Sequence, residues 1–392
     1  MITFLARMFI RDREQVKDPA VRRQYGMLCG CAGVGLNVLL FLGKLLAGTV
    51  SGSIAITADA FNNLSDAGSS LVTMLGFRLA GQKPDPGHPF GHGRFEYISG
   101  LIVAMAILLM GFELGKSSVE KILHPESVRF SALAAAILLV SVAVKLYMWA
   151  YNRSIGGKID SAAMKATAAD SLSDAVATTA VLLATLCGHL FQWNIDGWAG
   201  AVVSLFILLA GVGAARDTIS PLLGSAPDPQ LVRDITETVL SFPEISGVHD
   251  MAVHDYGPGR LMVSLHAEVP ADGDLLTLHD AIDRAEIALR EKFGCEAVIH
   301  MDPIATHDAH VVALREKMSQ LVHAVDPRLS IHDFRVVEGP SHTNLIFDVA
   351  CPFDLGHSDE EVARQIRETV SLLDGSYSAV LTIDRVYVPQ TT

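Results

Sequence analysis

Two stretches of the chain, ITADAFNNLSDAGSS (56–70) and ATAADSLSDAVATT (166–179), place aspartates within segments that otherwise consist of apolar and small residues. Each stretch carries a polar pair whose members are four residues apart: Asn62 with Asp66, and Asp170 with Asp174. Residues four apart lie on one face of a helix, so the members of each pair project together. A carboxylate at the centre of a bilayer costs about 2.5–3.5 kcal/mol on insertion scales. A bound divalent cation would offset that cost, whereas interhelical hydrogen bonding is the structural alternative.

These pairs belong to a series of apolar segments of about twenty residues, the length that crosses a bilayer as a helix. Because lipid offers no partners to backbone groups, helices are the expected form of such segments. Lys and Arg gather in the N-terminal tail and in the second and fourth loops, which predicts that both ends of the chain are cytoplasmic. We predict six spans: 27–50, 54–79, 98–117, 130–151, 163–189 and 197–215.

The two halves of the 392-residue chain differ in charge. Residues 1–220 hold 18 Lys and Arg against 15 Asp and Glu, a balance of +3, and residues 221–392 hold 12 against 28, a balance of −16. Neither half offers a basic surface that could neutralise phosphates, so we expect no nucleic-acid partner. The five cysteines include no CxxC pair, which argues against a disulfide framework or a zinc ribbon.

The C-terminal half contains an internal repeat. The segment PEISGVHDMAV…GPGRLMVSLHAEVP…VIHMDPI (243–304) matches PRLSIHDFRV…GPSHTNLIFDVACP…LTIDRVY (327–387) at an offset of about 82 residues. LMVSLHAEV (261–269) alternates apolar and polar residues, as a half-buried strand does, and DAIDRAEIALREKF (280–293) has helical spacing. Each copy is long enough for one small α/β unit.

The predicted fold is therefore a polytopic α-helical membrane protein with six transmembrane helices, followed by a cytoplasmic α/β domain in tandem duplicate. Its parts, in order, are a cytoplasmic tail, a transport domain, the first copy of the cytoplasmic domain, a linker helix, and a second, degenerate copy: 1–26, 27–220, 221–304, 305–326 and 327–392.

The paired polar residues, the six spans and the loop PDPGHPFGHGRFE (84–96) together resemble the cation diffusion facilitator family of divalent-metal/proton antiporters. The resemblance covers about residues 20–304. It implies a ferredoxin-like, metallochaperone-like cytoplasmic domain and a homodimer. It also implies that one pair from the second span and one from the fifth span build the transport site: Asn62, Asp66, Asp170 and Asp174.

This ligand set contains only oxygen donors. Zinc prefers nitrogen or sulfur ligands, whereas carboxylate and amide oxygens suit manganese and magnesium. Zinc-transporting members of the family usually place a histidine where this chain has Asp170. We therefore predict Mn²⁺ as substrate, with Zn²⁺ or Fe²⁺ as alternatives, and no prosthetic group. Clustered carboxylates bind protons when no metal is present, so an incoming divalent cation displaces protons.

The resemblance implies two secondary metal positions. The loop after the second span carries Asp85, His88 and His92 with the spacing D-x₂-H-x₃-H, where the family holds a peripheral site. In the cytoplasmic domain a second set of residues matches family positions that bind metal: His249, His266, His300 and Asp302. His279 and Asp250 are additional candidate ligands. The corresponding residues of the second copy are His332, Asp348, Thr382 and Asp384. Because two imidazoles are missing from this set, we expect the second copy's site to be lost or weakened.

The prediction is a multi-pass protein of the cell inner membrane that exports metal in exchange for protons. A membrane metal sensor with little flux is the alternative from another class. The sequence contains neither a GxxxxGK[ST] phosphate loop nor a GxSxG nucleophile elbow, and we expect no enzymatic activity.

Overall fold

A computed structural model of the chain describes residues 2–10, 13–16, 18–51, 54–124, 132–191, 196–305, 308–339, 342–373 and 376–386. It divides into two compact units. The first consists of Met1–Ser225 with Asp255–Arg260, and the second of Ala226–His254 with Leu261–Thr392. The start of the span predicted over 130–151 lies outside the described residues.

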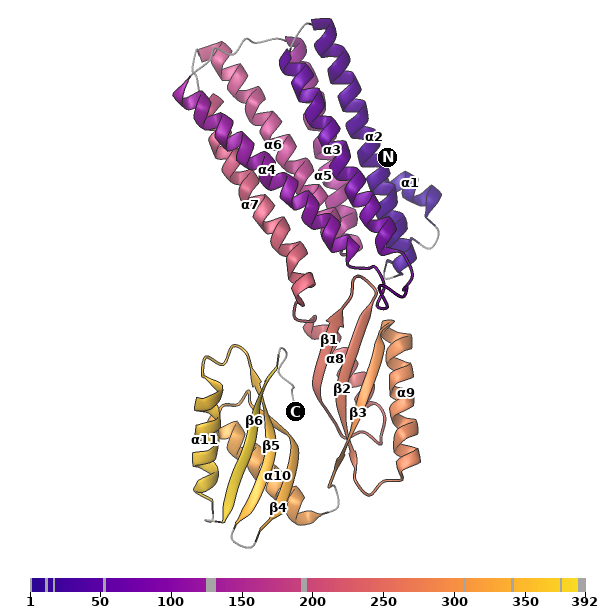
Figure 1. Cartoon of the computed structure of the whole chain (residues 1–392), viewed down its shortest axis with the longest axis vertical. Helices are drawn as coiled ribbons and strands as arrows, with labels where there is room; N and C mark the ends of the chain where they lie inside the picture. The colour runs from indigo at the N-terminus through magenta and orange to yellow at the C-terminus, as the bar shows by residue number, and fades with distance from the viewer. Residues whose placement is uncertain are drawn as a thin grey trace. The chain divides into compact units, whose positions relative to one another are not determined.

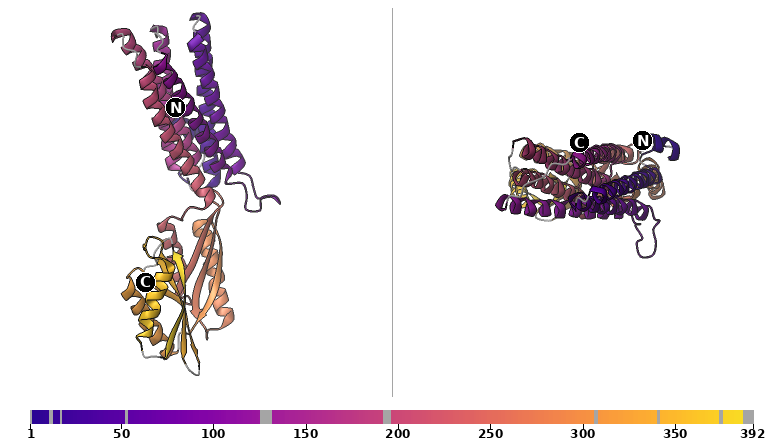
Figure 2. Two further views of the ribbon diagram at one scale, coloured as in Figure 1. Left: turned by 60° about the vertical axis from the view of Figure 1, so that its left-hand side comes forward. Right: turned by 90° about the horizontal axis from the view of Figure 1, so that it is seen from above.

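The first unit is built from helices (Figure 1). A short amphipathic helix comes first, and six long helices follow and run alongside one another within the unit (Figure 2). Their bounds are α1 Ile2–Phe9, α2 Pro19–Ser51, α3 Ile54–Ala80, α4 Phe95–Leu123, α5 Ala132–Lys158, α6 Ala162–Phe191 and α7 Asp196–Leu223. Each of the six predicted spans falls on one of the long helices.

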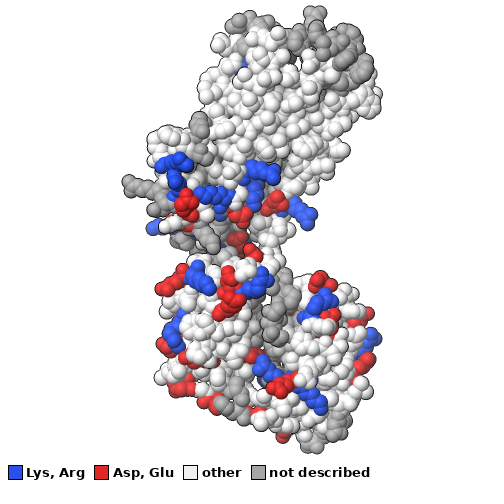
Figure 3. Space-filling model, turned by 180° about the vertical axis from the view of Figure 1, so that it is seen from behind, with Lys and Arg blue, Asp and Glu red and all other residues white. Residues whose placement is uncertain are grey.

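Four of these helices are long and apolar enough to cross a membrane, in the segments Ala20–Leu46, Phe95–Leu123, Ala135–Lys158 and Gly197–Leu223. The other two, α3 and α6, have 27 and 30 residues and carry the polar pairs. The face of this unit seen in Figure 3 shows few charged residues over most of its length, and Lys, Arg, Asp and Glu gather at one end. An apolar outer surface of this kind suits a bundle surrounded by lipid.

The second unit contains two three-stranded sheets with the same strand order, β1-β2-β3 and β4-β5-β6. Each sheet has helices before its first strand and after its second. The first copy comprises α8 Pro229–Leu240, β1 Gly247–Asp255, β2 Leu261–Pro270, α9 Leu275–Phe293 and β3 Glu296–Ile304. The second comprises α10 Ala309–Val325, β4 Ser330–Glu338, β5 Thr343–Pro352, α11 Asp359–Ser371 and β6 Tyr377–Val386.

Equivalent strands pair in the same way in the two copies. β2 and β3 are parallel, as are β5 and β6, and α9 and α11 provide the crossovers that parallel pairing requires. The helices start at local signals: Asp274 caps α9 through the backbone N–H of Thr277, and Ser358 forms a capping box with Glu361 at α11. The shared order of elements agrees with the internal repeat, while duplication as its origin stays a prediction.

The predicted linker helix over 305–326 has a different role in the structure. Helix α10 packs its apolar face into the core of the second copy, where Met318 and Val322 are buried against strand residues such as Phe347. Ile235 and Val239 of α8 hold the equivalent places in the first copy. Apolar residues four apart on α10 form a buried stripe, so this helix begins the second copy rather than connecting two finished domains.

Close packing in the membrane unit depends on Gly100 of α4. A Cβ at this position would lie 3.0 Å from the Cα of Ala163 on α6 and 2.7 Å from Cγ2 of Thr218 on α7. Ala163 and Thr218 are themselves fully buried. Gly100 therefore lets three helices approach each other, which is the usual role of small residues between membrane helices.

We expect Gly100→Ala to lower the free energy of unfolding by about 1–3 kcal/mol, because overpacking forces backbones apart. Gly213→Ala on α7 is the matched control, since a Cβ there meets no atom within 4 Å. Because alanine has a higher helix propensity than glycine, Gly213→Ala should leave the free energy of unfolding unchanged or raise it by up to about 1 kcal/mol. Denaturant unfolding of the detergent-purified chain measures both. Equal stability of the two variants would contradict the packing argument.

Candidate metal-binding sites

The two predicted polar pairs meet through their aspartates in the membrane unit. Asp66 of α3 and Asp170 and Asp174 of α6 each offer a carboxylate oxygen, and these oxygens lie within 4.8 Å of one another. Asp170 is only 7% exposed, and the side chains of Asp66 and Asp174 are 14% and 11% exposed. Three carboxylates at this spacing, one buried and two mostly buried, repel one another unless cations or protons neutralise them.

A hydrogen bond between the hydroxyls of Thr73 and Thr167, 2.8 Å apart, joins the two helices that carry the carboxylates. Thr167 lies one turn before Asp170 on α6 and Thr73 lies two turns after Asp66 on α3. Both hydroxyls are buried. Since hydroxyl pairs between membrane helices fix their relative position, this contact holds α3 and α6 at the distance that the cluster needs.

The amide residue beside the cluster is Asn63. Its Nδ2 donates to Asp66 Oδ2 at 3.3 Å, and its buried Oδ1 makes no hydrogen bond to the described residues. Asn62, which the sequence predicted as a ligand, is exposed. Positions three and four residues before Asp66 both lie on its side of the helix, so spacing alone does not distinguish the two asparagines. Asn62 as a ligand stays a prediction, and Asn63 is a second candidate.

Sequence reasoning missed Lys145 on α5. Its Nζ donates to Asp66 Oδ2 and to Asp174 Oδ2, both at 2.6 Å, and the residue is 2% exposed. The signal was available, because this lysine interrupts the apolar run SVAVKLYMWA (141–150). An ionisable residue inside a membrane span marks function by default, and its partners are here the predicted carboxylates.

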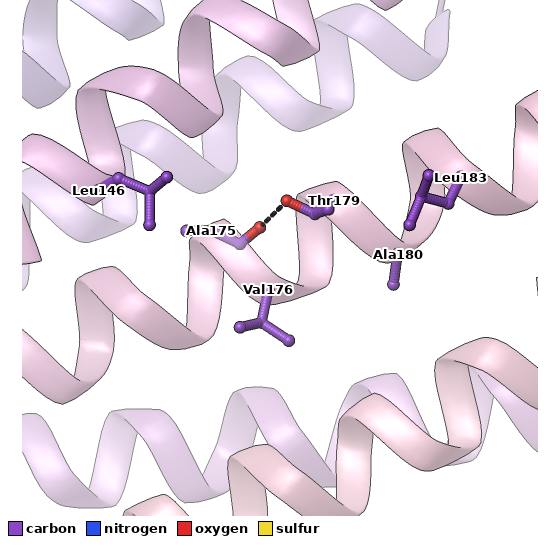
Figure 4. A pocket seen from close by; sticks show the side chains of 6 residues that line it. All are labelled: Leu146, Ala175, Val176, Thr179, Ala180 and Leu183. Carbon is purple, nitrogen blue, oxygen red and sulfur yellow. Dashed lines mark hydrogen bonds between the residues drawn. The ribbon is translucent and has the colours of Figure 1, made fainter.

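An apolar pocket of about 290 Å³ lies beside α6, and its lining on this helix begins with Ala175, the residue after Asp174. Figure 4 shows its lining, in which the only hydroxyl, that of Thr179, donates to the carbonyl of Ala175 at 2.6 Å. The remaining lining side chains are aliphatic: Leu146, Val176, Ala180 and Leu183. The pocket therefore offers no ligand to a cation and is distinct from the carboxylate cluster.

The structure brings together the three residues of the predicted loop site, whose role as metal ligands stays a prediction. Asp85 Oδ1 lies 3.6 Å from His88 Nδ1, and Oδ2 lies 3.3 Å from His92 Nε2. The backbone N–H of His88, together with that of Gly87 and the two imidazoles, lowers the pKa of Asp85. Arg260 anchors this loop by donating to the carbonyls of Gln82 and Phe90. The result is an exposed carboxylate that stays ionised beside two imidazoles, of which His92 is buried.

The first sheet of the second unit gathers the predicted cytoplasmic site across its three strands. Asp302 Oδ2 on β3 lies 2.8 Å from His266 Nδ1 on β2 and 3.3 Å from His249 Nε2 on β1. His300 Nε2 lies 3.2 Å from the other oxygen of Asp302. Strand pairing explains the meeting, since His266 and His300 are directly opposite in the β2–β3 register. One carboxylate with two or three imidazoles is a donor set typical of zinc.

Burial opposes charge on His249, but the carboxylates around it, with Asp250 foremost, raise the pKa of this imidazole. The same contact, led by His249, lowers the pKa of Asp250. Protons therefore compete with a metal for His249, and binding at this site strengthens as the pH rises. His279 lies elsewhere, on α9, where its Nδ1 is 3.4 Å from Asp283 Oδ2, and its role as a ligand stays a prediction.

Comparison with known proteins identifies the two units. Residues 31–223 match the cation efflux transmembrane domain, and residues 227–304 match the cytoplasmic domain of cation efflux proteins. An uncharacterized transporter of Methanocaldococcus jannaschii is 31% identical over 271 residues, covering 68% of this chain and 94% of the relative. The cation-efflux pumps FieF of Escherichia fergusonii and Escherichia coli are 26% identical over 287 residues, covering 72% of this chain and 95% of the relatives.

We expect Lys145→Met to make the purified chain depend on divalent cations for stability. Removing one partner of a buried ion pair costs about 3–5 kcal/mol, because uncompensated carboxylates remain. In thermal unfolding in detergent with chelator, Lys145→Met should have a lower Tm than the parent chain. Adding Mn²⁺ should raise the Tm of this variant more than that of the parent. Lys165→Met is the control, since that lysine pairs with Asp160 at an exposed position. An equal Mn²⁺-induced shift in all three proteins would refute the role of Lys145 as counterion.

Proposed function

This chain belongs to the cation diffusion facilitator family of cation-efflux proteins, and on that premise we propose that it exports Mn²⁺ from the cytoplasm in exchange for protons. Efflux of divalent metal follows from the family. The choice of metal and the exchange for protons are inferred from one observation, the oxygen-lined cluster of Asp66, Asp170 and Asp174 around Lys145.

The donor chemistry supports manganese. The cluster offers carboxylate oxygens and, from Asn63 or Asn62, an amide oxygen, and Lys145 has no lone pair to offer while protonated. Hard oxygen ligands suit Mn²⁺, whereas zinc gains most from imidazole and thiolate. Zn²⁺ and Fe²⁺ remain the alternatives, because the intrinsic order of affinities favours zinc over manganese at most sites.

The charges of the cluster support proton exchange. Three ionised carboxylates carry three negative charges, of which the ammonium of Lys145 balances one in the metal-free state. A divalent cation in its place would balance two. Without the metal the same oxygens attract protons, so binding of the two is mutually exclusive. A cation that binds Asp66 and Asp174 also has to displace the ammonium of Lys145, which would then move away while metal is bound.

The proposed setting is the cell inner membrane, with both ends of the chain cytoplasmic and a homodimer formed through the C-terminal unit. The imidazole-rich cluster around His249 favours a regulatory metal in that unit. A sensor with little flux is the second candidate on this ground. The intramembrane cluster favours transport over sensing, since a sensor has no need of carboxylates that are costly in lipid.

In proteoliposomes with an imposed pH gradient, we expect the chain to accumulate Mn²⁺, and Asp66→Ala or Asp170→Ala to abolish uptake by removing a ligand. Asp217→Ala, a change at an exposed position of α7, is the control and should retain uptake. Collapsing the pH gradient should stop uptake by the parent chain. Undiminished transport by Asp170→Ala would refute the site, and uptake that ignores the gradient would refute the exchange.

Asp170→His adds the imidazole that zinc prefers while keeping a ligand at the same place. We expect the ratio of initial Zn²⁺ to Mn²⁺ uptake rates to rise about tenfold, equivalent to about 1.4 kcal/mol of discrimination. Competition between the two ions in the same vesicles measures this ratio. A variant that still transports with an unchanged ratio would show that the cluster does not select the metal.

A further inference from the structure

The second copy within the second unit, from α10 to β6, carries its own group of side chains that could bind a metal. His332 on β4, Asp348 on β5 and Asp384 on β6 offer donor atoms that lie within 4.8 Å of one another. They occupy the places that His249, His266 and Asp302 hold in the first copy, 82 or 83 residues earlier. The sequence predicted a lost or weakened site here, because two imidazoles are replaced. The strands nevertheless bring the three remaining donors together.

The state of His332 points to a ligand. This residue is 5% exposed, and neither ring nitrogen makes a hydrogen bond to any described residue. Its Nε2 is turned toward the acidic group, 3.5 Å from Asp384 Oδ2. A buried polar group without a hydrogen-bond partner destabilises the folded chain, so native structures rarely keep one without a role. A cation between the imidazole and the carboxylates would satisfy it.

The first copy contributes a further oxygen. Asp250 Oδ1 lies 3.8 Å from His332 Nε2, while its Oδ2 lies 3.4 Å from His249 Nδ1. The rings of His249 and His332 stack with centroids 4.5 Å apart. Asp250 thus faces donor groups of both copies. Its counterpart Asp333 shares the same left-handed backbone but differs in contacts, because Arg335 binds its carboxylate at 2.6 Å.

We propose that His332, Asp348 and Asp384 bind a divalent first-row transition metal, with Asp250 of the first copy as the fourth ligand. One imidazole nitrogen and three carboxylates form a harder donor set than the histidine-rich group of the first sheet, and it accepts Mn²⁺ as well as Zn²⁺. The ion ties the two copies together, because its ligands come from both. This site does not depend on the transport proposed above.

Counting bound Mn²⁺ on the full-length chain in detergent tests the proposal without any transport measurement. Electron paramagnetic resonance distinguishes free from bound Mn²⁺ during a titration with MnCl₂. We expect Asp384→Asn and Asp348→Asn, which preserve side-chain volume, each to bind one Mn²⁺ fewer per chain than the parent. His332→Gln should show the same loss, because its imidazole is the one nitrogen ligand.

Asp333→Asn is the matched control, since it makes the same chemical change next to His332 in a carboxylate that Arg335 already binds. It should keep the full number of bound ions. Near-equal unfolding temperatures of the variants in chelator would show that the loss reflects missing ligands rather than misfolding. If Asp384→Asn and Asp348→Asn bind as many Mn²⁺ as Asp333→Asn, the site does not exist.

Discussion

The packing of the membrane unit depends on the two hydrogen bonds that the ammonium of Lys145 donates to Asp66 and Asp174, each 2.6 Å long. Carboxylates in a bundle surrounded by lipid are tolerated only where a partner neutralises them. The two hydrogen bonds of this ammonium join three helices, α3, α5 and α6. The metal selectivity that we propose would therefore depend on the same four side chains as stability in the metal-free state.

The two groups of candidate ligands differ in their donor atoms. The membrane cluster offers carboxylate oxygens beside an ammonium counterion, and the hard ion that we propose as substrate prefers such oxygens. The first sheet of the second unit offers several imidazoles with one carboxylate, a donor set that borderline ions such as zinc prefer. The two sheets differ in turn, because the second replaces two histidines by an aspartate and a threonine.

Much of the fold and part of the candidate site could be predicted from the sequence. The length of the apolar segments predicted the six long helices, and the offset of about 82 residues predicted two copies, which have equal strand order. Helical spacing indicated Asp66, Asp170 and Asp174 as candidate ligands. Spacing could not choose between Asn62 and Asn63, because both lie near the same helix face. Lys145 escaped because it stands alone in its span, and a pairing between distant helices leaves no local pattern. The role of α10 also escaped, since an amphipathic helix does not reveal which sheet it covers.

The most direct test of the account is to locate Mn²⁺ by its anomalous scattering in crystals of the full-length chain. We expect a peak bound by Asp66, Asp170 and Asp174, with the Lys145 ammonium withdrawn from at least one of its two carboxylates. A membrane unit that binds Mn²⁺ elsewhere, or a Lys145 that keeps both contacts beside the bound ion, would contradict it.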